Sequence, residues 1–261
     1  MIISKLQGGL GNQLFQWAVA RSYSDVHNCD HKLDTSFYPY QNFRQLELYN
    51  FENLTFSTIN RFDIGNPIIE INDNYHFQEL PYVNDCVVFL NGFWQSEKYF
   101  IKSQNIIRKE LSPDEEALSK LRKTPLLETN TLSLHIRRTD YVSSNGYHPV
   151  QPISYYEEAI KIIGDYDFIF VFSDDIEWCM NNLKFKNMIF MGGTPTGFSN
   201  VEEMWLMSMC KNHIIANSSF SWWGAWLNSN PNKKVVAPLN WFGSHTNIND
   251  SDIVPDSWIK I

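Results

Sequence analysis

The feature that most constrains the fold is the alternation of short apolar runs with longer amphipathic segments in the second half of the chain. A short apolar run bounded by loop residues is typical of a buried strand, whereas apolar residues at every third or fourth position are typical of a helix. The predicted strands are TLSLHI (131–136), DFIFVF (167–172), NMIFMG (187–192), HIIAN (213–217) and KKVVAP (233–238). The predicted helices are ISYYEEAIKII (153–163), DDIEWCMNNL (174–183), VEEMWLMSMC (201–210) and SWWGAWLN (221–228). Strands separated by helices imply right-handed βαβ crossovers, so we expect α/β architecture with a mostly parallel sheet.

The first half of the chain opens with a strand, a glycine loop and a helix, predicted for MIISKL (1–6), QGGLGN (7–12) and QLFQWAVARSYSDV (13–26). A further strand, CVVFLNGFW (86–94), and a helix over 96–111 follow. Ser112-Pro113-Asp114-Glu115 has the pattern of a capping box with proline at the first helical position, so a new helix is predicted over 112–123.

Two stretches of the first half lack a regular pattern. Residues 35–85 are rich in Phe, Tyr and Asn without clean periodicity, and we predict loops with short elements there. The polar stretch 123–131, which contains Pro125, is the best candidate for a domain junction. We therefore expect an N-terminal domain over 1–125 and a C-terminal domain over 126–261.

Composition excludes several classes of protein. The chain has 261 residues, 43% hydrophobic and 19% charged, which is typical of a folded globular protein. Its net charge of −8 argues against nucleic acid as a partner, because such binding depends on clustered Lys and Arg. The four cysteines are widely spaced, which favours free thiols over a zinc site or a disulfide scaffold.

The N-terminal apolar run breaks at Ser4 and Lys5, which is too short for a signal peptide, and no apolar run is long enough to span a bilayer. We expect a cytoplasmic protein with no integral membrane segment. Peripheral contact with the inner face of the membrane is compatible with this expectation.

Polar side chains follow three of the predicted strands, in the segments 135–140, 173–175 and 217–221. Open parallel sheets bind ligands at the carboxyl ends of their strands. If the three strands belong to one sheet, these segments can share one crevice.

Two adjacent arginines end the strand 131–136. The strand period of two places His135 and Arg137 on one face and turns Arg138 the other way. A guanidinium group can bind phosphate through two hydrogen bonds, so Arg137 could hold a diphosphate. Equally, it could pair with Asp140 and brace the loop, and the spacing alone leaves both interpretations open.

The stretch ANSSFSWWGAW (216–226) places Ser218, Ser219 and Ser221 at a predicted helix start. Unpaired backbone N–H groups beside serine hydroxyls can bind an anion, but serine N-capping uses the same geometry, and both interpretations remain open. The tryptophans are better explained as core residues than as a sugar platform. In FSDDIEWC (172–179) a helix-capping role is favoured for Asp175, while Asp174 could accept hydrogen bonds from a base edge.

The glycine loop departs from the dinucleotide fingerprint, because Leu14 stands where that fingerprint requires Gly or Ala. A nicotinamide site is therefore disfavoured. The glycines still allow close approach of a ligand to the backbone, and Asn12 and Gln13 offer directional donors and acceptors. A tight turn with an Asn cap is the equally good alternative.

Four motifs together resemble the bacterial α-1,2-fucosyltransferases of glycosyltransferase family 11. They are GGLGNQLFQWA (8–18), HIRRTDY (135–141), FSDDIEWC (172–179) and NSSFSWWGAWLN (217–228). The resemblance implies a GT-B-like fold, with two Rossmann-like domains whose mostly parallel sheets face a cleft. It also implies GDP-fucose as the donor and no metal or other cofactor, with the C-terminal domain binding GDP-fucose and the N-terminal domain on the acceptor side.

The same resemblance assigns roles to individual residues. It implies that Arg137 meets the diphosphate as a catalytic residue, His135 lies against the nucleotide, and Arg138 supports the loop. Asp174 would read the guanine edge. The further residues it implies are Ser218 and Ser219 at the phosphates and Gly9, Gly11 and Asn12 near the fucose and phosphate.

The implied reaction is inverting transfer of L-fucose to the 2-hydroxyl of a terminal β-galactoside, in O-antigen or related surface glycan synthesis. Fixed cations at the phosphates would stabilise the charge of the leaving diphosphate, and Asp140 is the candidate base for the acceptor hydroxyl. Another nucleotide-sugar transferase on the same fold is an alternative. A non-catalytic carbohydrate-binding protein is a further alternative, indicated by nine Trp, and a nicotinamide oxidoreductase is a distant third.

Overall fold

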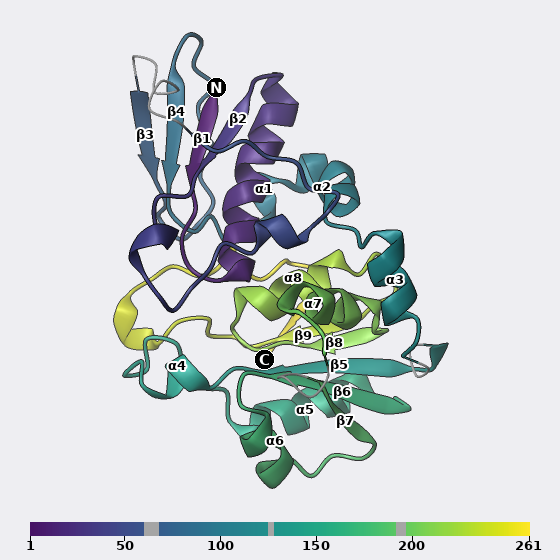
Figure 1. Cartoon of the computed structure of the whole chain (residues 1–261). Coiled ribbons are helices and arrows are strands. Elements are labelled where there is room, and N and C mark those ends of the chain that lie inside the picture. The colour runs from purple at the N-terminus through teal and green to yellow at the C-terminus, as the bar shows by residue number, and fades with distance from the viewer. Residues whose placement is uncertain (60–67, 125–127, 192–196) are drawn as a thin grey trace. The chain divides into compact units, whose positions relative to one another are not determined.

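The computed structural model describes residues 1–59, 68–124, 128–191 and 197–261 (Figure 1). The chain forms two compact units: unit 1 comprises Met1–Ser112 and Asn249–Pro255, and unit 2 comprises Pro113–Ile248 and Asp256–Ile261. The division therefore falls at Ser112–Pro113, earlier than the boundary expected near residue 125. A short segment close to the C-terminus also returns to unit 1, which no local pattern in the sequence indicates.

Unit 1 is built on a four-stranded parallel sheet in the order β2-β1-β4-β3. Its strands are β1 (Ile2–Lys5), β2 (His31–Asp34), β3 (Ile68–Asn72) and β4 (Val87–Asn91). Helix α1 (Leu10–His27) connects β1 to β2 and buries residues such as Val19 and Tyr23 in a core with Ile2 and Leu90. The predicted strand–loop–helix opening is confirmed.

Helix α1 begins three residues before the predicted start, so Gly11 and Asn12 lie in its first turn and not in a loop. Gly9 is the N-cap, in extended conformation. Leu10 is 4% exposed and lies with Leu14 on the buried side of the helix. This burial explains why the helix begins before Gln13.

The helix predicted over 96–111 is interrupted. Two 3-10 turns, Glu97–Tyr99 and Ile101–Ser103, precede α2 (Gln104–Glu110), and Phe100 between them has a φ of −137° that is incompatible with a helix. In the segment 35–85 the structure has 3-10 turns at Tyr38–Tyr40 and Leu48–Asn50 in addition to β3.

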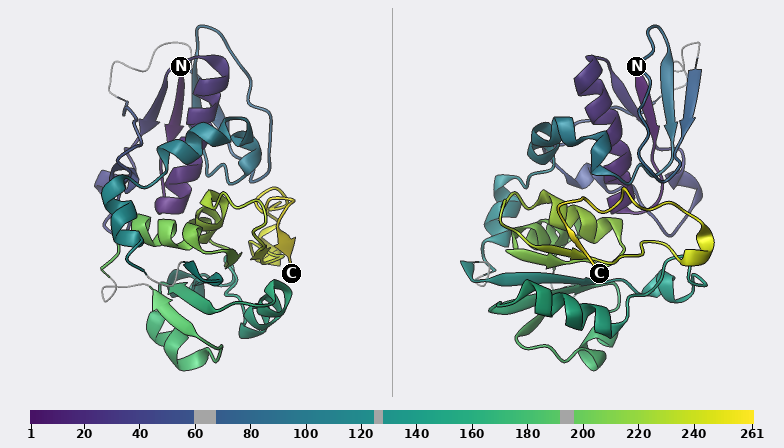
Figure 2. Two further views of the ribbon diagram at one scale, coloured as in Figure 1. Left: turned by 90° about the vertical axis from the view of Figure 1, so that its right-hand side faces the viewer. Right: turned by 180° about the vertical axis from the view of Figure 1, so that it is seen from behind.

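Unit 2 contains a six-stranded parallel sheet in the order β10-β9-β8-β5-β6-β7. Its strands are β5 (Thr131–Ile136), β6 (Phe168–Ser173), β7 (Met188–Met191), β8 (Asn212–Ile214), β9 (Val235–Ala237) and β10 (Ile259–Lys260). The helices are α3 (Glu115–Leu121), α4 (Thr139–Val142), α5 (Ile153–Ile163), α6 (Ile176–Asn182), α7 (Asn200–Met209) and α8 (Ser219–Leu227), and a 3-10 turn spans Ser244–Thr246. Figures 1 and 2 show α5 and α6 on one face of this sheet and α7 and α8 on the other. The predicted βαβ alternation is confirmed, although Gly192 of one predicted strand lies outside the described residues.

The capping box predicted at Ser112 is wrong. Asp114 is the N-cap of α3, and its carboxylate accepts a hydrogen bond from the Ala117 N–H at 2.7 Å. The Ser112 hydroxyl instead donates to the Lys109 carbonyl at 2.7 Å, at the end of α2. The carboxylate is favoured at this position because the partial positive charge of the helix N-terminus attracts an anion.

Across the ranges described above, none of the helices combines the length and the apolar composition that crossing a bilayer requires.

Candidate active site

Three neighbouring strands of unit 2 end at the same edge of its sheet. β5 pairs in parallel with β6, where Ile136 lies opposite Ser173, and with β8, where Leu134 lies opposite Ile214. The loops that follow β5 and β8 are also joined directly, since the Tyr141 hydroxyl donates to the Asn217 carbonyl at 2.8 Å. The three strands therefore belong to one sheet, as the expectation required, and the polar segments follow its strands at one edge; a crevice shared by these segments stays a prediction.

Arg137 lies just beyond the end of β5 and is held by two carboxylates. Its Nη2 and Nε atoms lie 2.8 Å and 3.0 Å from Asp140 Oδ1, and Nε lies 3.3 Å from Asp174 Oδ2. Burial opposes the charge of Arg137, but the hydrogen bond to Asp140 and the charges of both carboxylates outweigh it, so its pKa is raised. The guanidinium also lies 5.5 Å from the ring centre of Tyr141. The Arg137–Asp140 pair that the sequence left as one of two interpretations is present, and Arg137 remains a fixed cation.

Asp174 holds the loop after β5 in place. Its two oxygens accept hydrogen bonds from the backbone N–H of Arg138 at 2.9 Å and of Thr139 at 3.1 Å, and from the Thr139 hydroxyl. Together with its contact to Arg137, these bonds make Asp174 an anchor for the arginine pair. Its role at a guanine edge stays a prediction.

Arg138 points to a different set of partners. Its Nε lies 3.1 Å from Asp175 Oδ2, and its guanidinium lies 3.8 Å from the ring centre of Trp178 in α6. Asp175 also caps α6 by accepting from the Trp178 N–H at 3.2 Å, which confirms the predicted capping role. The two arginines thus diverge as the strand period predicts, and Arg138 braces the loop against α6.

His135 is a neutral, buried histidine at this edge. It is 4% exposed, and burial lowers its pKa to about 3, with Asp174 raising the pKa and Arg137 lowering it by smaller amounts. Its Nδ1 atom has no hydrogen-bond partner among the described residues. The ring lies 5.8 Å from that of Phe220, at the start of α8. His135 can therefore offer a neutral ring nitrogen, but no charge, to a ligand.

The start of α8 lacks ordinary serine capping. Ser218 occupies the N-cap position, yet its side chain makes no capping hydrogen bond, and Ser219 begins the helix. The buried Ser221 hydroxyl donates to the Ser218 carbonyl at 3.2 Å. Anion binding by Ser218 and Ser219 stays a prediction, and the first-turn N–H groups carry no side-chain cap that would compete with it.

The tryptophans of α8 are core residues, as expected. Trp222 and Trp223 are fully buried and Trp226 is 2% exposed, and their ring centres lie 5.2 to 6.1 Å from one another.

The remaining predicted site residues belong to unit 1. The Asn12 side-chain oxygen accepts from Gln95 Nε2 at 2.7 Å, which ties the start of α1 to the segment that follows β4. Neither Gly9 nor Gly11 has a positive φ. The position that needs glycine is Gly8, with a φ of +81° and Asn12 Nδ2 only 2.7 Å from where its Cβ would lie. The sequence signal for it was the Gly8–Gly9 doublet.

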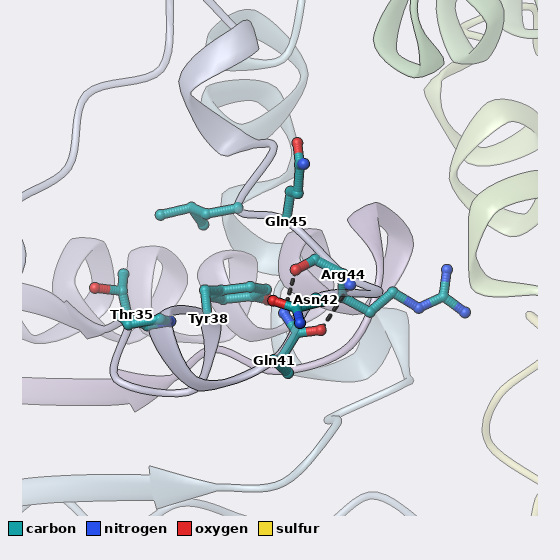
Figure 3. Close-up of a pocket in the computed structure, with 8 residues that line it drawn as sticks. Thr35, Tyr38, Gln41, Asn42, Arg44 and Gln45 are labelled. Carbon is teal, nitrogen blue, oxygen red and sulfur yellow. Dashed lines mark hydrogen bonds between the residues drawn. The ribbon is translucent and has the colours of Figure 1, made fainter.

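Sequence reasoning also missed a pocket of about 450 Å³ in unit 1 (Figure 3). It is formed by the loop after β2, and the residues that line it include Thr35, Tyr38, Gln41, Asn42, Arg44 and Gln45. The abundance of aromatic and amide side chains in this segment was the only available signal.

Among the residues that the structure describes, no group of three or more His, Cys, Asp or Glu side chains is placed to hold a metal ion.

The sequence model described as Glycosyl transferase family 11 matches residues 68–261. Two proteins of Escherichia coli are similar over the whole chain. Alpha-1,2-colitosyltransferase is 34% identical over 100% of this chain and 99% of its own length, and the O-antigen biosynthesis glycosyltransferase WbnK is 33% identical over 99% of both.

Solved structures show the same fold at low identity. Fucosyltransferase NodZ from Bradyrhizobium matches with a TM-score of 0.54 at 14% identity, covering 85% of this chain and 91% of NodZ. POFUT1 in complex with GDP matches with a TM-score of 0.54 at 11% identity, covering 90% of this chain and 97% of that one. The α/β architecture with two parallel sheets is of the GT-B type, as expected.

Proposed function

Because the chain belongs to glycosyltransferase family 11, we propose that it is an inverting galactoside α-1,2-fucosyltransferase. It would move L-fucose from GDP-fucose to the 2-hydroxyl of a terminal β-galactoside in the synthesis of O-antigen or a related surface glycan. Two whole-length relatives, one named for α-1,2 transfer and one for O-antigen biosynthesis, support the linkage and the setting. NodZ and POFUT1 have both been crystallised with GDP, which supports the choice of donor nucleotide.

The observation that carries the proposal is the position of Arg137. It is a partly buried, permanently charged fork at the carboxyl edge of a parallel sheet, oriented by Asp140 and Asp174. Departure of GDP places negative charge on the diphosphate as the sugar gains oxocarbenium character. A fixed cation at that point stabilises the transition state more than the ground state, because the charge develops during the reaction. Arg137 is therefore the proposed catalytic residue.

The other residues of the edge have supporting roles in the proposal. The first-turn N–H groups and hydroxyls of Ser218 and Ser219 bind phosphate oxygens, and neutral His135 lies against the nucleotide. Asp174 reads the guanine edge in addition to anchoring the loop, and Arg138 keeps that loop against α6. No metal ion is required, since arginine and backbone donors supply the positive charge.

Unit 1 is the proposed acceptor side. Gly9, Gly11 and Asn12 at the start of α1 lie near the fucose and phosphate in this proposal. Asp140, whose side chain is 47% exposed, removes the proton from the acceptor hydroxyl.

A second candidate donor is a colitose nucleotide. The observation that favours it is the 34% identity with Alpha-1,2-colitosyltransferase over the whole chain. Fold and family do not fix the sugar, because specificity resides in side chains around it.

The proposal is tested by measuring GDP release from GDP-fucose in EDTA, with and without lactose and N-acetyllactosamine. We expect acceptor-dependent release and a product whose mass is increased by one fucose. GDP-colitose and GDP-mannose in place of GDP-fucose would identify the donor sugar. Binding of the glycans without any GDP release from these donors would contradict the proposed activity.

A further inference from the structure

The pocket in unit 1 is a preformed structure, because a buried glutamine fastens its wall to the start of α1. Gln13 is 0% exposed, and its Nε2 donates to the carbonyls of Gln45 at 2.8 Å and Gly8 at 3.2 Å. Its Oε1 accepts from the Glu47 N–H at 2.9 Å. One side chain thus fixes both the glycine loop (7–12) and the far end of the loop that lines the pocket (the pocket loop, 35–47).

A second amide fixes the turn within the pocket loop. Gln41 Oε1 accepts from the N–H groups of Phe43 at 3.0 Å and Arg44 at 2.6 Å, and its Nε2 donates back to the Arg44 carbonyl. A loop held in this way loses little conformational entropy when a ligand binds, which favours specific binding.

The side chains left to face a ligand have the chemistry that recognises a sugar. In Figure 3 the half-buried Tyr38 ring lies between Thr35 and Asn42. The Asn42 and Gln45 side chains are exposed and make no hydrogen bond within the described part of the chain. Each amide offers donors and an acceptor side by side, which suits neighbouring hydroxyls, and the Tyr38 face suits the apolar face of a pyranose ring.

Exposed aromatic residues flank the same loop. Tyr40 is 89% exposed and Phe43 is 77% exposed, the two highest values among the exposed large hydrophobic residues of the described chain. Single exposed aromatics are common on protein surfaces, but two beside a polar pocket extend an apolar surface next to hydrogen-bonding groups.

The lining of the pocket is almost entirely uncharged. Arg44 is the one charged residue among the described residues that line it, and in Figure 3 its side chain extends away from Tyr38. An uncharged ligand therefore fits this lining.

Arg44 connects the pocket to the glycine loop. Its side chain extends away from Tyr38 in Figure 3, and its Nη1 lies 3.6 Å from where a Cβ on Gly9 would be. The pocket therefore borders the N-terminus of α1, which the proposed function places beside the transferred sugar.

We infer that this pocket binds an uncharged hexopyranose unit of the acceptor glycan, with Asn42 and Gln45 hydrogen-bonded to its hydroxyls and Tyr38 beneath its ring. The inference rests on the proposed function, which it deepens by naming the acceptor subsite.

The test compares Asn42→Ala and Gln45→Ala with the matched control Asn50→Ala, an exposed asparagine of the same segment outside the pocket lining. Direct binding of methyl β-D-galactopyranoside to the full-length chain is measured by NMR titration, and the acceptor and donor KM by GDP release. Loss of one hydrogen bond corresponds to a roughly tenfold weaker affinity, so both pocket variants should raise the Kd and the acceptor KM about tenfold. The donor KM should move less than twofold.

Equal affinities in the pocket variants and in Asn50→Ala would overturn the subsite. Tighter binding of the corresponding galacturonide than of the neutral galactoside would overturn its uncharged character. If the wild type binds the galactoside but transfers nothing to it, the proposed function fails, while a tenfold weaker Kd in Asn42→Ala would still support the pocket as a sugar site.

Discussion

Arg137 is the residue on which the proposed chemistry depends. Replacing it with alanine should cost roughly 2.7–4 kcal/mol of transition-state stabilisation, or about 10²–10³ in kcat, by analogy with loss of one oxyanion donor. Arg137→Lys retains the charge but loses the planar fork, so it should recover only part of this loss. The measurement is kcat by GDP release, with the thermal unfolding temperature as the control for folding. Near-wild-type turnover in Arg137→Ala would remove the central assignment.

Asp140 has two possible roles that a single substitution separates. If Asp140 is the base, Asp140→Asn should lower kcat about 10²–10⁴-fold and remove the acidic limb of the pH–rate profile. If Asp140 is only a partner of Arg137, the substitution should leave that limb in place, because Asp174 still lies 3.3 Å from the Arg137 Nε. We expect the first result in Asp140→Asn. An active variant with an unchanged pH profile would show that Asp140 positions Arg137 and takes no proton.

At the scale of elements, α8, which begins at Ser219, packs against α7. Gly224 lies in this contact, and a Cβ there would lie 2.4 Å from the Sδ and 2.9 Å from the Cγ of Met207. Overpacking of this kind costs about 1–3 kcal/mol, whereas alanine gains at most about 1 kcal/mol over glycine in a helix. Gly224→Ala should therefore lower the free energy of unfolding by about 1–2 kcal/mol in denaturant titrations.

The control for this prediction is the same substitution in a Met207→Ala background. With the clashing side chain removed, Gly224→Ala should become neutral or stabilising, so the two changes should show a clear coupling energy. Equal effects in both backgrounds would show that the destabilisation does not come from contact with the Met207 side chain.

The elements that the sequence predicted are those with a strong local signal. β6 begins with a continuous run of five apolar residues, and β5 has a leucine or isoleucine at every second position. α5 and α7 follow the helical period, so these four elements could be identified. β3 was missed because it is an edge strand with no buried residue, and Glu70 and Asn72 interrupt its isoleucines. β10 has two residues, too few for any pattern.

The residues of the candidate site also divide into those with a local sequence signal and those without one. Arg137, its partner Asp140 and the cap Asp175 lie within a few residues of a strand end, where spacing has predictive value. The sugar pocket depends on Gln13, whose bonds to Gln45 and Glu47 cross more than thirty residues of sequence. Such long-range hydrogen bonds leave no periodic trace, and the pocket could not be predicted.

At the scale of the whole molecule, buried titratable groups set how stability depends on pH. His213 is fully buried between the Ser133 hydroxyl, 2.8 Å from its Nδ1, and Asn228 Nδ2, 2.7 Å from its Nε2. Burial lowers the pKa of His213 to about 3, with the charge of Lys233 adding to the effect, and the pKa of His135 is likewise about 3. Burial raises the pKa of Glu203 to about 7.

Between about pH 4.5 and 6.5 the lowered histidine pKa values and the raised Glu203 pKa change the free energy of unfolding in opposite directions. Below pH 6.5 the unfolded chain binds protons at both histidines that the folded chain leaves neutral, so acid favours unfolding. In the same range folded Glu203 holds a proton that the unfolded chain has lost, so acid favours folding there. His31 and His148, whose pKa values burial also lowers, act in the same direction as these two histidines. The histidines together outweigh one glutamate, so the unfolded state binds at least about one more proton. The free energy of unfolding therefore falls by at least about 1 kcal/mol per pH unit as the pH falls.

The slope of stability against pH, measured by denaturant unfolding from pH 6.5 to 4.5, tests this balance residue by residue. His213→Gln removes one of the histidines that bind protons on unfolding, so its slope should become shallower by about 1 kcal/mol per pH unit, whatever the loss of the Ser133 and Asn228 contacts does to the absolute stability. Glu203→Gln removes the opposing group and should make the slope steeper by about 1 kcal/mol per pH unit. Because the two variants are expected to change the slope in opposite directions, a slope unaffected by either would show that the acid sensitivity of this protein originates in other groups.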